Sequence, residues 1–133
     1  MVLSLSNKSA MNEIIIKPIG VVHGSPSDEQ QVIEVYPQHC EGLHRIGELD
    51  ELWVLFWLHK LDETGRRTYR VHPRGDGSRP MYGVFALHSP MRPNPIGITR
   101  VKLIARQGNR LIVSGLDALD GSPVIDIKGE PPR

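Results

Sequence analysis

The chain contains a single cysteine, Cys40, so it cannot form an internal disulfide, and nothing in its composition points to an oxidising compartment. Its longest apolar run, Leu52–Leu58, is much shorter than the roughly 20 residues that a membrane-spanning helix needs. Residues 1–13 hold no continuous apolar stretch of the kind found in secretion signals. These absences predict a cytoplasmic protein with no membrane partner.

The sequence also lacks the motifs of several enzyme classes. Six histidines are present, but they form no HxH or HxxxH pair, so we expect no metal site. The GxSxG motif of α/β hydrolases and the GxGxxG motif of dinucleotide-binding domains are both absent. Ser89 follows His88, but neighbouring side chains on an extended segment point to opposite sides and make a poor catalytic pair.

Charge is nearly balanced overall and unevenly distributed along the chain. The net charge is +1, which by itself suggests no nucleic-acid partner. Between Lys60 and Arg110, however, 11 Lys/Arg stand against 3 Asp/Glu. This basic segment is compatible with a polyanion partner, although a solvated surface gives the same pattern.

Short β-branched and apolar segments separated by Gly and Pro dominate the chain, whose 133 residues suit one domain. Only Pro37–Leu49 favours a helix. We therefore predict an all-β fold, a small antiparallel β-barrel with one or two short helical segments, with a sandwich as the alternative. Residues 1–13 are expected to be a flexible arm, 14–128 the barrel and 129–133 a tail. The predicted strands are Ile14–Val22, Gln31–Tyr36, Glu51–His59 (the central strand, anchored by Trp53 and Trp57), Thr68–Val71, Val84–Ala86, Ile98–Ala105, Leu111–Gly115 and Val124–Ile127.

The most distinctive stretch is Gly83–Gly97, which reads GVFALHSPMRPNPIG. Its three prolines each fix a backbone φ angle and push the preceding residue into an extended conformation. We expect a stiff loop that presents Arg92 and Asn94 outward, as a binding surface would. A plain irregular connection is the alternative.

A second turn-rich segment, Asp120-Gly121-Ser122-Pro123, also lies at a strand junction. In a barrel it could meet the His88–Pro95 loop at one rim. His59 and Lys60, where the central strand ends, could join them. The resulting mixture of cations, amide, backbone donors and carboxylate would suit a small charged metabolite.

These stretches resemble the signatures of a known family, the TsaA-like, TrmO-type methyltransferases that use S-adenosylmethionine. Gly83–Gly97 resembles the family run GVFATRSPxRPNPIG, and LDALDGSPVIDIK at Leu116–Lys128 resembles a second signature. The resemblance runs from about Ile14 to Lys128. It implies a single β-barrel, usually dimeric, that binds S-adenosylmethionine and methylates N6 of N6-threonylcarbamoyladenosine beside the anticodon of tRNA.

Carried over position by position, the resemblance implies a set of cofactor-binding residues in and around these loops. A carbamoylated adenine nitrogen is a poor nucleophile, so Asp120 or Asp126 is a plausible base; structural roles for both are the alternative. The cofactor-binding set is His59, Lys60, His88, Ser89, Arg92, Pro93, Asn94, Pro95, Ile98, Asp120, Gly121, Ser122 and Pro123.

The chain departs from the family pattern at three places. Leu87-His88 stands where the family has Thr-Arg, the segment Gly24–Gln31 is shorter than the family's loop, and Gly129-Glu130 stands where the family has Pro-Tyr. Two alternatives to the tRNA methyltransferase follow. One is a barrel that binds S-adenosylmethionine or RNA without catalysis, and the other is a methyltransferase with a different acceptor.

Overall fold

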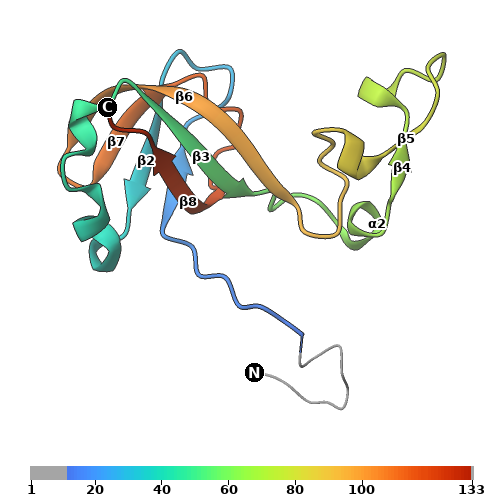
Figure 1. Cartoon of the computed structure of the whole chain (residues 1–133), viewed down its shortest axis with the longest axis horizontal. Coiled ribbons are helices and arrows are strands. Elements are labelled where there is room, and N and C mark those ends of the chain that lie inside the picture. The colour runs from blue at the N-terminus through green and yellow to red at the C-terminus, as the bar shows by residue number, and fades with distance from the viewer. Residues whose placement is uncertain (1–11, 133) are drawn as a thin grey trace.

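Six antiparallel β-strands close into a barrel in the order β1-β2-β7-β6-β3-β8. The structure, a computed structural model, describes residues 12–132. The predicted antiparallel barrel is therefore confirmed, while the expected N-terminal arm lies largely outside the described residues (Figure 1). The strands of the barrel are β1 (Gly20–His23), β2 (Gln31–Val35), β3 (Glu51–Trp57), β6 (Ile96–Gln107), β7 (Arg110–Ser114) and β8 (Pro123–Gly129).

Alternating side chains fill the barrel. Along β2 the pattern places Gln31, Ile33 and Val35 inside, and along β3 it places Leu52, Val54 and Phe56 inside. Because successive side chains of a strand point to opposite faces, every second residue reaches the core. The one inward polar side chain of β2, Gln31, is satisfied, since its amide donates to Ser25 O and Asp28 O and its carbonyl accepts from Leu116 N.

β3 pairs with β6 on one side and β8 on the other, but every strand of a closed barrel has two neighbours, so no strand occupies the central position predicted for β3. The predicted role of its tryptophans is wrong. Trp53 and Trp57 alternate with the buried residues and face outward, where Arg100 and Arg66 lie over their rings at 5.7 and 5.6 Å. These guanidinium groups shield the outer face of β3.

Residues 58–95 leave the barrel between β3 and β6 and form a separate projection, which we call the lobe. Figure 1 shows the lobe extending away from the barrel, at the right of the view. It has little core of its own, with Gly65, Pro73 and Val84 buried. Its elements are α2 (Glu63–Arg66), β4 (Arg70–Val71), η3 (Pro73–Gly75), β5 (Tyr82–Gly83) and η4 (Val84–Ala86).

The predicted helical segment at Pro37–Leu49 is confirmed as two short 3-10 helices, η1 (Pro37–Leu43) and η2 (Ile46–Glu48). Pro37 stands at the start of η1, where its missing N–H is no loss. Within residues 12–132 no helix is long and apolar enough to cross a membrane.

Several predicted strand limits are wrong; for example, β3 ends at Trp57 rather than His59, and β6 runs from Ile96 to Gln107 rather than from Ile98 to Ala105. The first strand begins at Gly20 rather than Ile14, and Pro18 has no N–H to offer a neighbouring strand. Val84–Ala86 forms η4 instead of a strand, and Val84 O accepts from Leu87 N and from Arg92. Gly129, expected in the tail, is the last residue of β8.

Candidate functional site

The site lies at the neck where the lobe joins the barrel. The two segments of the chain that form the neck are joined by a backbone hydrogen bond, which Leu58 N donates to Pro95 O at 2.7 Å. The bond lies just beyond Trp57 and Ile96, the last residue pair of β3 and β6. This bond fixes where His59 and the end of the Pro-rich loop emerge from the barrel. The predicted meeting of these two segments is confirmed.

The turn before β8 reaches the same place. Ser122 is 2% exposed, and its hydroxyl donates to Leu119 O at 2.6 Å and lies 3.4 Å from His59 Nδ1. Gly121 N donates to Val22 O, and Val22 N donates to Ser122 O, which attaches the turn to β1. The turn is thus a fixed wall beside His59.

A groove runs along the neck in two adjoining parts, of about 580 and 240 Å³. We call it the neck groove. Phe56, Leu58, Pro90 and Asp117 line both parts. Of the residues predicted from the sequence, it is lined by His59, Lys60, His88, Ser89, Arg92, Asn94, Ile98 and Ser122. Pro93 and Pro95 lie outside it and shape the loop.

The Asp120 side chain, in the turn before β8, accepts a hydrogen bond from the backbone. Its Oδ1 accepts a hydrogen bond from Gly24 N at 2.9 Å and so connects the turn to the end of β1. Asp120, Gly121 and Pro123 do not line the neck groove.

Arg92 organises the Pro-rich loop from within. Its guanidinium donates to Ser89 O at 2.7 Å and Val84 O at 3.1 Å, and lies 3.5 Å from Leu87 O. The expectation that the loop presents Arg92 outward is therefore wrong. The Arg92 guanidinium group, which is planar and carries five N–H donors, points into the loop and hydrogen-bonds its backbone carbonyls. Asn94 is exposed as expected.

Gly97 is required for the neck groove to have this form. A Cβ atom at this position would lie 2.6 Å from the ring of Phe56, which is the residue directly opposite on β3. Glycine therefore lets the aromatic ring lie flat under the start of β6.

Sequence reasoning missed the carboxylate of the neck groove. Asp117 is exposed and lines both parts of the groove, whereas the predicted Asp120 does not line it. The Asp-Gly pair at 120–121 is a turn signal and needs no functional role. Asp117 stands between two apolar residues, Leu116 and Ala118, both of which are buried. This alternation places the Asp117 side chain on the outer side of the segment, and it is the sequence signal that could have identified Asp117.

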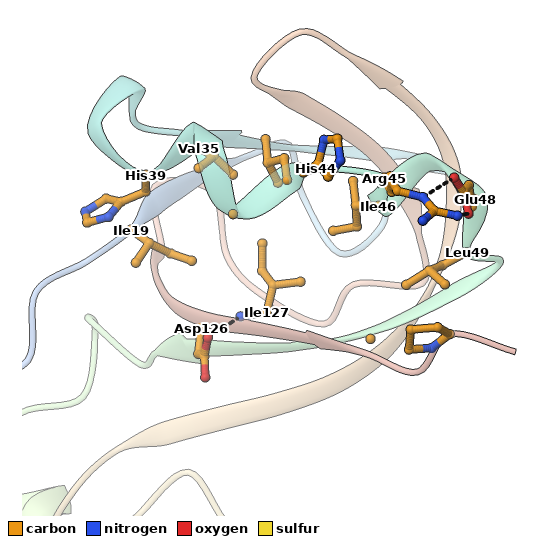
Figure 2. Close-up of a pocket in the computed structure, with 14 residues that line it drawn as sticks. Ile19, Val35, His39, His44, Arg45, Ile46, Glu48, Leu49, Asp126 and Ile127 are labelled. Carbon is orange, nitrogen blue, oxygen red and sulfur yellow. Dashed lines mark hydrogen bonds and ion pairs between the residues drawn. The ribbon is translucent and has the colours of Figure 1, made fainter. Parts of the chain in front are cut away.

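Asp126 lies in a different cavity, between the 3-10 helices and β8. The volume of this pocket is about 590 Å³. Figure 2 shows its lining residues, with Asp126 beside Ile127. The Asp126 carboxylate accepts from Ile127 N at 2.9 Å and pairs with Lys128 at 3.4 Å. At the other end of the pocket the Glu48 carboxylate raises the pKa of Arg45 by accepting its hydrogen bonds. The structure therefore separates Asp126 from the other predicted site residues.

Comparisons with known proteins agree with this architecture. An S-adenosyl-L-methionine-binding protein of Archaeoglobus fulgidus is 42% identical over 132 residues, which cover 90% of this chain and 91% of the relative. A mouse tRNA (adenine(37)-N6)-methyltransferase is 39% identical over 92 residues, covering 69% of this chain and 20% of the mouse protein.

The crystal structure of TrmO from Pseudomonas aeruginosa has a TM-score of 0.68 and 27% identity, and the match covers 90% of this chain and 57% of that chain. This chain thus spans little more than half of the solved protein. Residues 13–131 match the family described as the tRNA-methyltransferase O N-terminal domain. Since that match takes in the whole barrel and the lobe, this chain belongs to the family of the tRNA-methyltransferase O N-terminal domain.

Proposed function

We propose that this protein is an S-adenosylmethionine-dependent methyltransferase that methylates a tRNA adenosine, N6 of N6-threonylcarbamoyladenosine beside the anticodon. Family membership and the named activities of the relatives support the reaction class. The observation that carries the proposal is the neck groove, because it gathers residues from β3, β6, the Pro-rich loop and the turn before β8.

The residues of the neck groove fit the chemical groups of S-adenosylmethionine. The larger part of the groove, about 580 Å³, falls in the volume range of small-molecule sites, and the smaller part of about 240 Å³ adjoins it. Phe56 and Leu58 offer an apolar wall for a purine. Asp117 offers a carboxylate to the positively charged sulfonium, and Lys60 offers a cation to the cofactor's carboxylate.

When bound, S-adenosylmethionine supplies an electrophilic methyl group, which moves to the acceptor nitrogen as its bond to sulfur breaks. An in-line displacement of this kind depends mainly on alignment of the reacting atoms. In this chain the alignment is supplied by the Ser122–His59 contact on one side and by the Arg92-organised loop on the other.

The acceptor nitrogen must also lose its proton. We propose Asp117 as the base that takes it, because its carboxylate is exposed to the groove. Asp120 is the second candidate, since only its Oδ1 is engaged by Gly24 N. Asp126 is in a separate pocket and is assigned no part in this reaction.

The test is a methyl-transfer assay with the purified protein, methyl-labelled S-adenosylmethionine and tRNA that contains the threonylcarbamoyl modification. After digestion, we expect the label in the methylated form of that nucleoside alone. Label in another nucleoside would show a different acceptor. Saturable cofactor binding without any labelled product would show a binding protein without turnover.

That non-catalytic protein is the second candidate function. It is favoured by His88, which lines the neck groove where the family has arginine, and by the position of Asp120 outside that groove, where its Oδ1 accepts from Gly24 N. A homodimer in the cytoplasm also remains a prediction, which light scattering and fractionation would test.

A further inference from the structure

The lobe carries a second cavity that the cofactor does not need. It has a volume of about 810 Å³ and lies between residues 71–81 and 87–91. We call it the lobe groove. Its lining is largely apolar, from Val71, Pro73, Met81 and Met91, and two arginines, Arg74 and Arg79, also line it. Apolar side chains combined with guanidinium groups offer contacts to a nucleobase and to its phosphate.

The lobe is the basic part of the protein. Residues 58–95 hold seven Lys/Arg and three Asp/Glu, a net charge of +4, whereas the whole chain carries +1 and the remainder is therefore −3. A polyanion is attracted to the lobe and repelled by the remainder of the chain. The net positive charge of the lobe favours a polyanion such as RNA as the occupant of the lobe groove, and the oligomeric-state measurement below tests the alternative of a second copy.

The three acidic residues of the lobe are engaged in local contacts. Asp62 caps α2 by accepting from Gly65 N at 2.8 Å, and Glu63 pairs with Arg66 at 3.6 Å. Asp76 accepts from the Ser78 hydroxyl at 2.6 Å and from Ser78 N at 2.9 Å. Among residues 12–132, Arg74 and Arg79 make no ion pair with an acidic side chain, so their charges are available to a ligand.

Local backbone contacts set the positions of these two arginines. Arg74 has a φ angle of 55°, a left-handed conformation that is uncommon for any residue other than glycine. The backbone carbonyl of Arg79 lies 2.7 Å from His72 Nδ1, within hydrogen-bonding distance, which ties the two sides of the loop together. Strained backbone held by its neighbours is frequent at ligand-binding positions.

The lobe groove adjoins the neck groove. Leu87, His88, Ser89 and Pro90 line both, so one short segment separates the two cavities. A nucleotide seated in the lobe groove is therefore next to the place proposed for the methyl donor. His88 stands on this dividing segment and is exposed.

From these observations we propose that the lobe groove is the RNA subsite, which binds single-stranded nucleotides beside the acceptor. A base packs against Met81 and Met91, and Arg74 and Arg79 contact the flanking phosphates. This inference rests on the proposed function, since it assigns a place to the substrate of the same site.

The first experiment measures binding of a labelled anticodon stem–loop RNA to the full chain at several salt concentrations. In the double variant Arg74→Gln/Arg79→Gln we expect at least a tenfold loss of RNA affinity. The slope of log affinity against log salt should shrink by about 1.4, because each lost phosphate contact on a single strand removes about 0.7. The matched control, Arg45→Gln/Arg110→Gln, removes two charges from the barrel and should leave affinity within about threefold.

A second variant tests the groove without removing an arginine. Met81→Glu places a carboxylate in the lobe groove at a residue that is 49% exposed, so folding should be retained. We expect weaker RNA binding and unchanged affinity for S-adenosylmethionine. Equal RNA binding by wild type and both lobe variants overturns the proposal, as does equal loss in the barrel control.

Two further outcomes are also decisive. If the lobe variants change the oligomeric state in light scattering, the groove is a protein interface and the RNA subsite is wrong. If the wild-type protein binds no RNA, the subsite is likewise overturned. If the wild type binds RNA through the groove but transfers no methyl group, the subsite stands and the proposed methyltransferase activity fails.

Discussion

The Ser122 hydroxyl lies 3.4 Å from Nδ1 of His59 and connects the turn before β8 to the end of β3. These residues are 63 positions apart in the sequence. Their contact occurs because β3 pairs with β8, which brings the end of one strand to the beginning of the other. Around this contact the barrel contributes one wall of the neck groove, and the Pro-rich loop of the lobe contributes the other.

Replacement of Ser122 by alanine should weaken both the fold and the site. The buried hydroxyl donates to Leu119 O, which keeps its second hydrogen bond from Ser122 N when the hydroxyl is removed. We therefore expect a loss of about 0.5–1.5 kcal/mol in the free energy of unfolding, the value of one ordinary hydrogen bond. Denaturant titration of wild type and Ser122→Ala measures it, with the exposed Ser27→Ala as control. An unchanged midpoint in Ser122→Ala would show that the hydrogen bond contributes nothing.

Gly97→Ala should be destabilising because the new methyl group meets the Phe56 ring. Overpacking of this kind costs about 1–3 kcal/mol. A methyl group added at Gly77 would have no atom within 4 Å, and Gly77 has no positive φ, so Gly77→Ala is a matched control. Thermal unfolding compares the two variants. Equal melting temperatures would contradict the close approach of β6 to Phe56.

Removal of the Arg92 side chain should loosen the Pro-rich loop without unfolding the barrel. Three carbonyls of the loop lose their guanidinium partner, and lysine cannot replace a planar fork. We expect amide hydrogen exchange over residues 84–91 to quicken at least tenfold in Arg92→Ala and in Arg92→Lys. The barrel strands should exchange as in the wild type, as should the whole chain in Arg67→Ala. Unchanged exchange in the loop would mean that the prolines alone hold it.

Asp76 gives a pH-dependent signal in the lobe. Two hydrogen bonds from Ser78 lower the pKa of the Asp76 carboxyl, the larger effect coming from the hydroxyl and the smaller from the backbone N–H. A pKa that is lower in the folded protein stabilises the loop above the unfolded value, about 3.9, and this contribution disappears as pH falls through the folded pKa. In Ser78→Ala the pKa should rise toward its ordinary value. Carboxyl NMR titration measures it, and an unchanged pKa would contradict the assignment.

The sequence was sufficient for the barrel, because period-two alternation and regular turn signals are local properties of each strand. It was insufficient wherever a side chain's direction depended on a distant partner. Trp53 and Trp57 read as core residues, yet Arg100 and Arg66 cover them on the outer face. Val84–Ala86 has strand composition but turns into a 3-10 helix whose first carbonyl accepts from Arg92.

For the candidate site, the sequence predicted which segments meet but not which carboxylate lines the groove. The two signature loops and the end of β3 do meet, which follows from their places at strand junctions. The choice of carboxylate did not follow, because both Asp117 and Asp120 stand in the same turn-rich segment. The structure distinguishes the two aspartates, because Asp120 accepts a hydrogen bond from Gly24 N and Asp117 lines the neck groove.

The most direct measurement is calorimetric titration with S-adenosylmethionine of the wild-type protein and two matched variants. Asp117→Asn removes a carboxylate from the neck groove, and Asp126→Asn removes one from the pocket beside the 3-10 helices. We predict saturable binding by the wild type, at least tenfold weaker binding by Asp117→Asn, and wild-type binding by Asp126→Asn. No binding by folded wild-type protein, or a loss confined to Asp126→Asn, would contradict the assignment of the cofactor to the neck groove.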